Sequence, residues 1–115
     1  MSTHHERVAV LMGGWTPEAS VSRVSASFCG QAARNAGWDA VEIEVDRDIA
    51  ARLAEFKPGR VFNALHGQIG EDGNIQGLLN IMNIPYTHSG LAASAIAMDK
   101  ILAKTMLADC GILVP

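Results

Sequence analysis

The segment VFNALHGQIGEDGNIQG, residues 61–77, holds an apolar run, a glycine-rich loop and the start of a helical pattern. The run Val61–Leu65 has the length of a buried strand. Four glycines then fall within residues 66–77, and such a cluster indicates turns with positive φ or a close approach to a ligand. Apolar residues at helical spacing follow, at Ile75, Leu78 and Met82. We therefore expect a strand, a site loop at its carboxyl end and a helix, the place where open α/β sheets bind ligands.

Strand and helix patterns alternate along the rest of the chain. The unbroken apolar run Val8–Met12 is typical of a central parallel strand covered on both faces. The predicted strands are Arg7–Met12, Asp39–Val45, Arg60–Leu65 and Ile84–Thr87. The predicted helices after the first one are Ile49–Phe56, Ile75–Met82, Leu91–Met98 and residues 99–109. This order predicts one α/β domain over residues 1–115, Rossmann-like, with three αβα layers and a parallel sheet of about four strands.

The first predicted helix follows the turn Gly13-Gly14. We expect Thr16 and Ser20 to cap this helix and Gly37 to end it. Its expected apolar face is formed by Val21, Val24, Phe28 and Ala32. Neither a GxGxxG pattern nor a Walker A motif is present, which argues against a generic nucleotide-binding module. Glu18 would repel a phosphate, so it indicates either a cationic ligand group or a carboxylate that only complements the helix dipole.

Composition and charge exclude several classes of function. The formal net charge is −3, apolar residues make up 49% and charged residues 18%, which is typical of a soluble globular domain. Without a Lys/Arg cluster, neither nucleic acid nor an anionic membrane is an expected partner. No apolar run approaches the roughly 20 residues of a spanning helix. The two cysteines, Cys29 and Cys110, are expected to be reduced and buried in a cytoplasmic protein.

Several polar residues are open to two interpretations at this point. His66 is either a site residue or a structural histidine after a buried strand, and Glu71 is either a site carboxylate or a solvated loop charge. Lys100 is either a phosphate ligand or a helix-surface lysine. Asp72 is interpreted as a turn former before Gly73. No metal site is expected, since His4 and His5 are an isolated pair near a terminus.

Three groups of motifs, in this order, carry a resemblance to a known family. They are VAVLMGG (8–14) with Glu18 and Val21-Ser22; ALHG (64–67) with GEDGNIQG (70–77); and IPYT (84–87) with Ser89-Gly90 and AMDK (97–100). Together they resemble the N-terminal domain of D-alanine–D-alanine ligases, ATP-grasp enzymes of peptidoglycan precursor synthesis. The resemblance covers Val8 to Pro115. It implies that the central and C-terminal ATP-grasp domains, with the Mg²⁺ ligands, lie outside this chain.

The resemblance also implies roles for particular residues. In the family, ATP phosphorylates the carboxylate of one D-alanine, and the amine of a second attacks this D-alanyl phosphate. Glu18 matches the glutamate that holds the first substrate's ammonium group, His66 the histidine beside it, and Glu71 a further substrate-loop residue. Lys100 matches a lysine that reaches the nucleotide phosphates. Gly13, Gly14, Gly67, Gly70 and Gly73 are expected to shape the loops, with Ser22 and Ser89 as possible loop anchors.

The chain departs from the family pattern at two places. Ala19-Ser20 replaces a charged Arg-Glu pair after the substrate glutamate, and His88 stands where glycine is frequent. The family implies a homodimer for the intact enzyme, and the 115-residue chain alone is expected to be inactive. The alternative is a non-catalytic domain that binds a D-amino acid or another protein. Ile112–Val114 is expected to form an exposed apolar patch.

Overall fold

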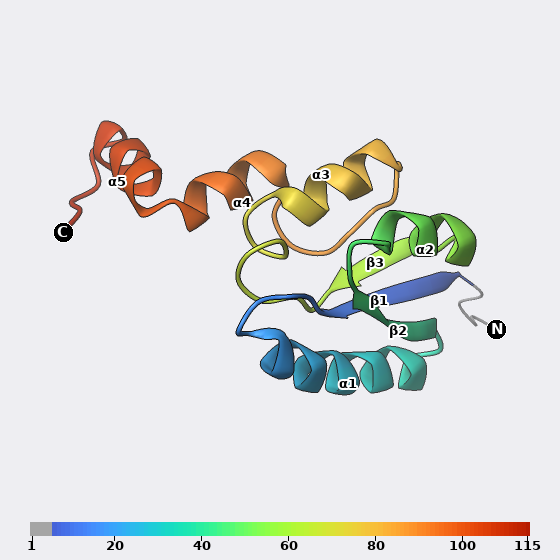
Figure 1. Ribbon diagram of the computed structural model, residues 1–115. Helices are drawn as coiled ribbons and strands as arrows, with labels where there is room; N and C mark the ends of the chain where they lie inside the picture. Colours follow the sequence, from blue (N-terminus) through green and yellow to red (C-terminus); the bar gives the residue numbers. More distant parts are fainter. Residues whose placement is uncertain (1–5) are drawn as a thin grey trace.

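The computed structural model describes residues 6–115; His4 and His5 lie outside the described residues. Its strands are β1 (Arg7–Gly13), β2 (Asp39–Val45) and β3 (Arg60–Asn63). Its helices are α1 (Ala19–Asn35), α2 (Ile49–Phe56), α3 (Asn74–Ile81), α4 (Leu91–Met98) and α5 (Lys100–Asp109). Helix α1 lies on one side of the sheet, and α2 and α3 lie on the other (Figure 1). The expected three-layer α/β fold is confirmed.

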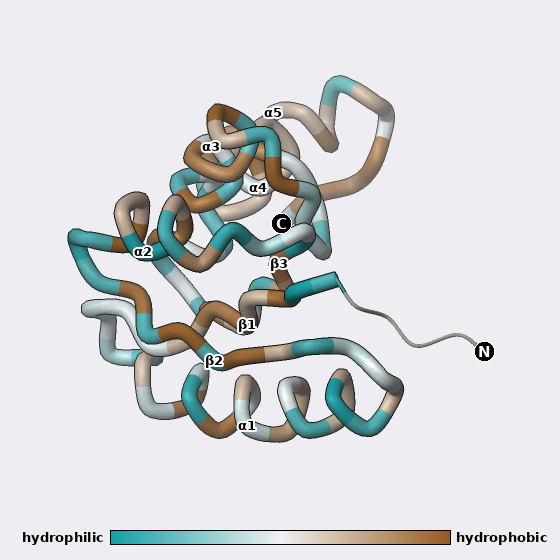
Figure 2. The backbone as a smooth tube through the Cα atoms, turned by 90° about the vertical axis from the view of Figure 1, so that its right-hand side faces the viewer, coloured by the Kyte–Doolittle hydropathy of each residue, from teal (hydrophilic) through white to brown (hydrophobic). Residues whose placement is uncertain are grey.

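The sheet is parallel and has the strand order β2-β1-β3. Strand β1 is paired along its whole length with β2, from Arg7 opposite Asp39 to Gly13 opposite Val45. Its other edge pairs with β3, which ends where Leu11 lies opposite Asn63. The central position of β1 fits its unbroken apolar run, which is the continuous brown stretch in the middle of the sheet in Figure 2. The loops after β1 and β3 therefore leave the sheet side by side.

Alternation along β1 builds one core on each face of the sheet. Ala9 and Leu11 point towards α2 and α3, where the main core also contains Leu53, Ile75 and Leu79. Val8 and Val10 point towards α1 and pack with smaller residues, Ala26, Ala40 and Ala64. On the α1 side, the helix thus contributes small side chains to the core, and Met12, Trp38 and Phe62 pack against it.

The expected fourth strand, Ile84–Thr87, is reduced to a single parallel bridge between Val61 and Tyr86. Val61 N–H donates to Pro85 O, and Thr87 N–H donates to Val61 O, at 2.9 and 3.1 Å. The next donor, Asn63 N–H, is taken by the Thr87 side-chain hydroxyl at 3.0 Å instead of a backbone carbonyl. The ladder stops there, so the sheet has three strands in the described part of the chain, and the prediction of about four was too high.

The predicted apolar face of α1 is wrong. Val21, Val24 and Phe28 are 58%, 59% and 75% exposed, and Ala32 is exposed as well. The buried face consists of small residues, Ala19, Ser22, Ala26 and Gly30. The positions of α1 that face the sheet carry small residues, and Met12, Trp38 and Phe62 pack against this core from outside the helix. The larger apolar side chains of the helix point to solvent.

The predicted helix caps are also corrected. Helix α1 begins at Ala19 with Glu18 as N-cap, not Thr16 or Ser20, and no side chain caps it. Helix α3 has Gly73 as N-cap, with φ 100°. Asp72 Oδ1 accepts from Asn74 N–H at 3.1 Å, so Asp72 is the turn former that the sequence indicated.

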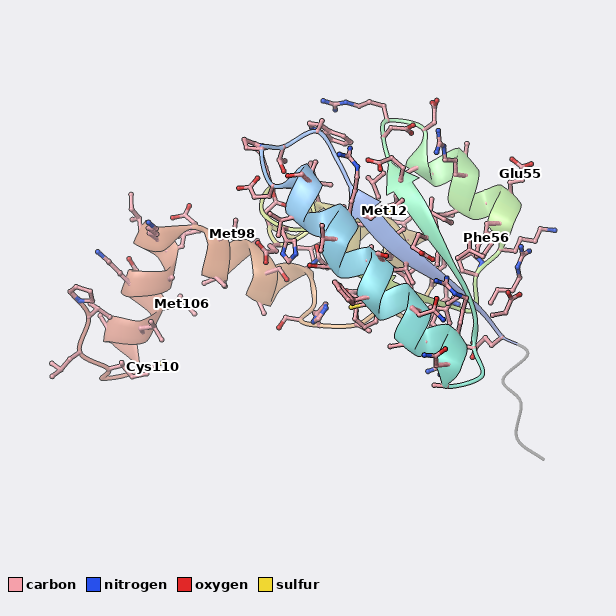
Figure 3. All side chains as sticks on the ribbon, turned by 90° about the horizontal axis from the view of Figure 1, so that it is seen from below. Met12, Glu55, Phe56, Met98, Met106 and Cys110 are labelled. Atoms are coloured by element: carbon pink, nitrogen blue, oxygen red, sulfur yellow. The ribbon has the colours of Figure 1, made fainter. Side chains whose placement is uncertain are left out.

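Two parts of the molecule differ in packing, and we call residues 6–87 the body and residues 91–115 the arm. The arm projects from the body (Figure 1), and the radius of gyration is 15.6 Å, against about 13 Å expected for a compact chain of this length. No residue of α5 is buried. Met106 and Cys110 lie on the far part of the arm (Figure 3).

Both cysteines are free, but Cys29 is half-buried and Cys110 exposed, so their expected burial is wrong.

Candidate functional site

The loops after β1 and β3 are joined by one buried serine of α1. Gly13 N–H donates to Ser22 Oγ at 3.0 Å. The Ser22 hydroxyl in turn donates to Ala64 O at 2.8 Å. Ser22 is completely buried, and both bonds are therefore shielded from water. The expected anchor role of Ser22 is confirmed: it fixes the start of α1, and with it Glu18, relative to both strand ends.

Glu18 lies against the β3 loop. Its carboxylate sits over Gly67, where an added methyl group would lie 2.9 Å from Glu18 Oε2. Gly67 has φ 73°, a conformation that also favours glycine. The backbone conformation thus favours glycine at position 67, and the Glu18 carboxylate lies over it. The structure brings Glu18 together with the loop that holds His66 and Glu71.

Glu71 closes the β3 loop on itself. Its Oε2 accepts from Gly67 N–H at 2.6 Å, and its own N–H donates to Gly67 O at 2.9 Å. This pair of bonds holds Gly67 in the geometry that admits Glu18. The carboxylate of Glu71 is exposed and keeps free acceptor positions.

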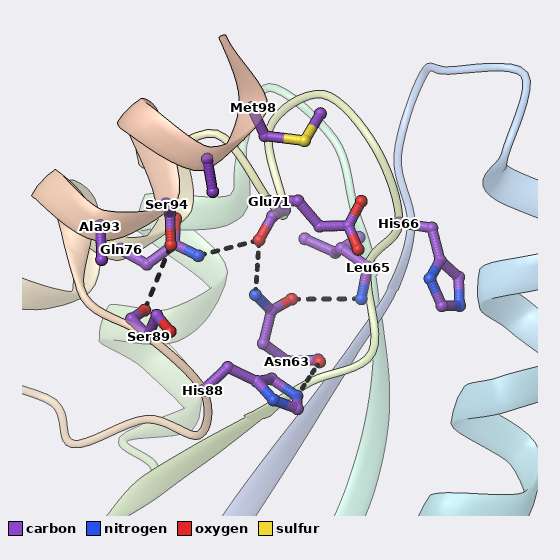
Figure 4. A pocket seen from close by; sticks show the side chains of 12 residues that line it. Asn63, Leu65, His66, Glu71, Gln76, His88, Ser89, Ala93, Ser94 and Met98 are labelled. Atoms are coloured by element: carbon purple, nitrogen blue, oxygen red, sulfur yellow. Dashed lines mark hydrogen bonds between the residues drawn. The ribbon is translucent and has the colours of Figure 1, made fainter. Parts of the chain in front are cut away.

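His66 is half-buried and turns away from the other cavity side chains, towards α1 (Figure 4). Its Nε2 lies 3.1 Å from Ser25 Oγ. Among residues 6–115, no other hydrogen bond or ion pair of the imidazole is seen.

A cavity of about 420 Å³ lies between the β3 loop and α4. His66 and Glu71 lie at its edge, and Asn63 and Gln76 form part of its lining. Both amides donate to Gly70 O, at 2.8 and 2.9 Å (Figure 4). Gln76 Oε1 is buried and has no partner within the described residues. The size of the cavity is within the range of small-molecule sites.

Asn63 and Gln76 were not singled out in the sequence, although both support the Gly70 turn. Asn63 Oδ1 also accepts from Leu65 N–H at 3.1 Å, which ends β3 before Ala64. The sequence did hold a signal for both residues. Asn63 is an amide inside an apolar run, and Gln76 is an amide between the core residues Ile75 and Leu79. A buried amide needs hydrogen-bond partners, and a neighbouring glycine loop offers them.

Glu44 and Arg23 support the glycine loop from the other side. The Glu44 carboxylate contacts Gly13 and accepts from Gly14 N–H. Arg23 of α1 donates two hydrogen bonds to it, at 2.9 and 3.1 Å. These bonds hold the pKa of the Glu44 carboxyl below its ordinary value. The loop before the Ala19-Ser20 departure is thus supported by a pair formed between α1 and β2.

Lys100 lies apart from this cluster. It is the first residue of α5, it is exposed, and it is not among the residues that line the cavity. Asp99 precedes it and caps α5, accepting from Ile101 and Leu102 N–H at 3.0 Å each. Ser89 is exposed as well, and only its backbone carbonyl is used, by Ser94 Oγ at 3.3 Å.

A metal-binding cluster and a membrane-spanning helix are both absent from residues 6–115. No group of three or more His, Cys, Asp or Glu side chains is arranged to hold a metal ion there. In the same range, no helix combines the length and the apolar character needed to cross a bilayer.

Comparisons with known proteins agree with this geometry. Residues 48–89 match the family described as D-ala D-ala ligase N-terminus. The chain is 53% identical over 110 residues, 96% of its length, to a D-alanine–D-alanine ligase of Azorhizobium caulinodans, and 53% identical over all 115 residues to that of Novosphingobium aromaticivorans. The crystal structure of a D-alanine–D-alanine ligase from Bacillus anthracis complexed with ATP superimposes with a TM-score of 0.82 at 33% identity.

The matched part is only a portion of each relative. The chain spans 36% and 37% of the length of the ligases of Azorhizobium caulinodans and Novosphingobium aromaticivorans. In the comparison with the Bacillus anthracis structure, 96% of this chain matches 38% of the ligase chain. The similarity thus extends over almost the whole chain, from the β1 glycine turn through the β3 loop to the arm. The chain belongs to the family of D-alanine–D-alanine ligase N-terminal domains.

Proposed function

We propose that this chain is the N-terminal substrate-binding part of an ATP-dependent D-alanine–D-alanine ligase of peptidoglycan precursor synthesis. The observation that carries the proposal is the Glu18 carboxylate, which lies over Gly67 in the loop that also holds His66 and Glu71; Glu18 itself is not among the residues that line the cavity. A carboxylate fixed by a buried anchor and open to solvent is suited to an ammonium group. The two loops that form this cluster follow adjacent parallel strands.

In this proposal each residue of the cluster has a separate task. Glu18 binds the ammonium group of the first D-alanine and so orients its carboxylate. His66 forms a hydrogen bond to the same substrate. Glu71 keeps the Gly67 turn in place through the bonds described above, and its exposed face contacts the substrate.

Lys100 would contact the nucleotide in the intact enzyme. Its ammonium group is exposed and has no ion-pair partner within residues 6–115, so it is available to phosphate oxygens. ATP, bound with Mg²⁺, supplies the phosphoryl group that activates the carboxylate of the first D-alanine for attack by the second. The Mg²⁺ ligands and most nucleotide contacts are proposed to lie in ATP-grasp domains outside this chain.

Further parts of the proposal concern the whole protein. Residues 1–115 form one domain that works with the ATP-grasp domains, and the 115-residue chain alone does not catalyse ligation. The intact enzyme acts in the cytoplasm as a homodimer. Its partners are D-alanine and ATP, without nucleic acid or membrane.

The proposal is tested by titrating D-alanine into the ¹⁵N-labelled chain and following backbone amide shifts by NMR. Saturable shifts are expected around Glu18, Gly67 and Glu71, because the ammonium group binds there. Glu18→Gln removes the charge at nearly constant shape, and should abolish these shifts. Glu55→Gln, on the opposite side of the sheet on α2, is the matched control and should bind like wild type (Figure 3). Shifts that persist in Glu18→Gln would contradict the assigned role.

A non-catalytic interaction domain is the second candidate, favoured by the exposed apolar residues of α5. Ile101, Leu102 and Met106 are 79%, 49% and 50% exposed. If D-alanine produces no shift that depends on Glu18, this candidate takes precedence. Formation of ADP from ATP by the chain with D-alanine would contradict the expected inactivity of the isolated chain.

A further inference from the structure

Ser25 and His66 are 41 residues apart in sequence and meet between α1 and the β3 loop. Ser25 Oγ lies 3.1 Å from His66 Nε2, and both side chains are half-buried. A serine inside a helix commonly bonds to the carbonyl four residues earlier, as Thr105 does on α5 with Ile101 O at 2.8 Å. The hydroxyl of Ser25 is directed to the imidazole instead.

The position of Ser25 on α1 explains this contact. Ser22 and Ser25 are three residues apart and therefore share one face of the helix. That face meets the segment after β3: Ser22 bonds to Ala64 O, and Ser25 bonds to the side chain two residues later. One rigid helix thus carries Glu18 at its start and fixes the segment that holds His66.

A hydrogen bond at one ring nitrogen restricts the orientation of the imidazole and leaves the other nitrogen free for a further partner. Nε2 is occupied by Ser25, while Nδ1 has no partner within residues 6–115. No carboxylate of the described chain pairs with the imidazole. Ser25 is therefore the group that sets the orientation of the ring.

We propose that Ser25 is a positioning residue: it holds the His66 ring through Nε2 and leaves Nδ1 as the nitrogen that faces a bound amino acid. This inference rests on the proposed function only for the identity of that amino acid. The contact between Ser25 and the imidazole exists without substrate, so it can be tested separately.

The first test is NMR of the ring nitrogens in the ligand-free chain, at a pH of about 8, where an ordinary imidazole is neutral. In wild type, the ¹⁵N shift of His66 Nε2 should be displaced by its hydrogen bond to the Ser25 hydroxyl. Ser25→Ala should move the two shifts towards the averaged values of a free histidine peptide. Ser25→Thr keeps a hydroxyl and should restore the wild-type pattern. Ser27→Ala, an exposed serine on the same helix, should change nothing. Unchanged His66 shifts in Ser25→Ala would overturn the inference.

The second test is the affinity for D-alanine. Ser25→Ala should weaken binding about 2- to 10-fold, the range of one hydrogen bond, while Ser25→Thr and Ser27→Ala stay close to wild type. If wild type fails to bind D-alanine, the proposed function fails, and the ring ¹⁵N shifts of the ligand-free chain still decide the role of Ser25. If binding is present and Ser25→Ala leaves it unchanged, the positioning role is refuted.

Discussion

The body and the arm contain similar apolar residues in opposite surroundings. Leu11, Leu53 and Leu79 of the body are at most 1% exposed, whereas Ile101 and Leu102 of the arm are 79% and 49% exposed. Both parts contain helices, and the difference lies in what each helix packs against. The helices of the body cover a sheet, while α5 contacts mainly α4.

This difference separates two sources of helical stability. Isolated helices of about ten residues are marginal in water, and tertiary packing supplies most of their stability. In the arm, local interactions are the ones that the structure shows, such as the Asp99 cap and the bond from Thr105 to Ile101 O. The site cluster is built on the packed part, and Lys100 on the unpacked part. We therefore expect Glu18, His66 and Glu71 to be held in place in the chain alone, and Lys100 to be held only once α5 is covered.

The largest expected effect is the difference in unfolding free energy when leucine is replaced by alanine in the body and in the arm. Leu79→Ala should lower the free energy of unfolding by about 2–5 kcal/mol, because it opens a cavity in the core. Leu102→Ala should change it by less than about 0.5 kcal/mol, since this side chain is half exposed on α5. Urea denaturation followed by circular dichroism measures both. Equal losses would show that the arm is packed in solution and would remove the contrast.

The next effect concerns the anchor inside the body. Ser22→Ala removes an acceptor from Gly13 N–H and a donor from Ala64 O, and should cost about 1–3 kcal/mol of unfolding free energy. Ser27→Ala is the matched control on the exposed face and should stay within about 0.5 kcal/mol. The same urea experiment applies. If both variants unfold together, Ser22 does not join the two loops as described.

The fold and the composition of the site loop could be predicted from the sequence because both depend on local pattern. The apolar run of β1 and the glycines after β3 specify a parallel sheet with a loop at its carboxyl edge. The orientation of α1 could not be predicted, since periodicity points to Val21, Val24 and Phe28, while the face that packs against the sheet carries small residues. Apolar periodicity identifies a helix, and its tertiary contacts decide which face is buried.

The contacts within the site depend on residues distant in sequence, and this is why they escaped prediction. Ser25 and His66 are 41 positions apart, and Arg23 and Glu44 are 21 positions apart. Ser25, Arg23 and Glu44 had no signal of their own in the sequence, and for His66 the sequence did not indicate a partner. The loop glycines were recognised because their requirement is in the backbone itself, as at Gly67, with φ 73°.

A smaller effect should appear in the dependence of stability on pH. Hydrogen bonds from Arg34 and Arg23 lower the pKa of Glu42 and Glu44, respectively. Since the folded chain then binds protons less readily than the unfolded one, this stabilisation is present above the ordinary carboxyl pKa and is lost as the pH falls through the lowered values. The double variant Glu42→Gln/Glu44→Gln should be less stable than wild type near neutral pH, and the gap should close in acid.

Thermal unfolding between about pH 7 and pH 3 measures this gap. Glu55→Gln is the control, because Glu55 is exposed on α2 and forms no ion pair within residues 6–115. Its curve should run parallel to that of wild type. A gap that stays constant with pH would mean that the two ion pairs do not stabilise the α1–β2 layer.

The smallest effect is expected at the junction of body and arm. His88 adopts φ 75°, a region that costs a residue with a side chain about 1–2 kcal/mol relative to glycine. Its Nε2 lies 3.1 Å from Asn63 O, and such a bond contributes about 0.5–1.5 kcal/mol. His88→Gly removes the cost and the bond together, so the free energy of unfolding should change by less than about 1 kcal/mol. The hydrogen bond thus offsets the strain that a histidine introduces where the family often has glycine.

Lys57→Gly separates these two contributions. Lys57 has φ 54° at the end of α2, and the described residues show no hydrogen bond from its side chain. Glycine there should stabilise the chain by up to about 1 kcal/mol, because strain is relieved and no bond is lost. If His88→Gly stabilises the chain as much as Lys57→Gly in thermal unfolding, the bond to Asn63 O contributes nothing. If it destabilises the chain clearly, the imidazole is a real link that holds the start of the arm to the end of β3.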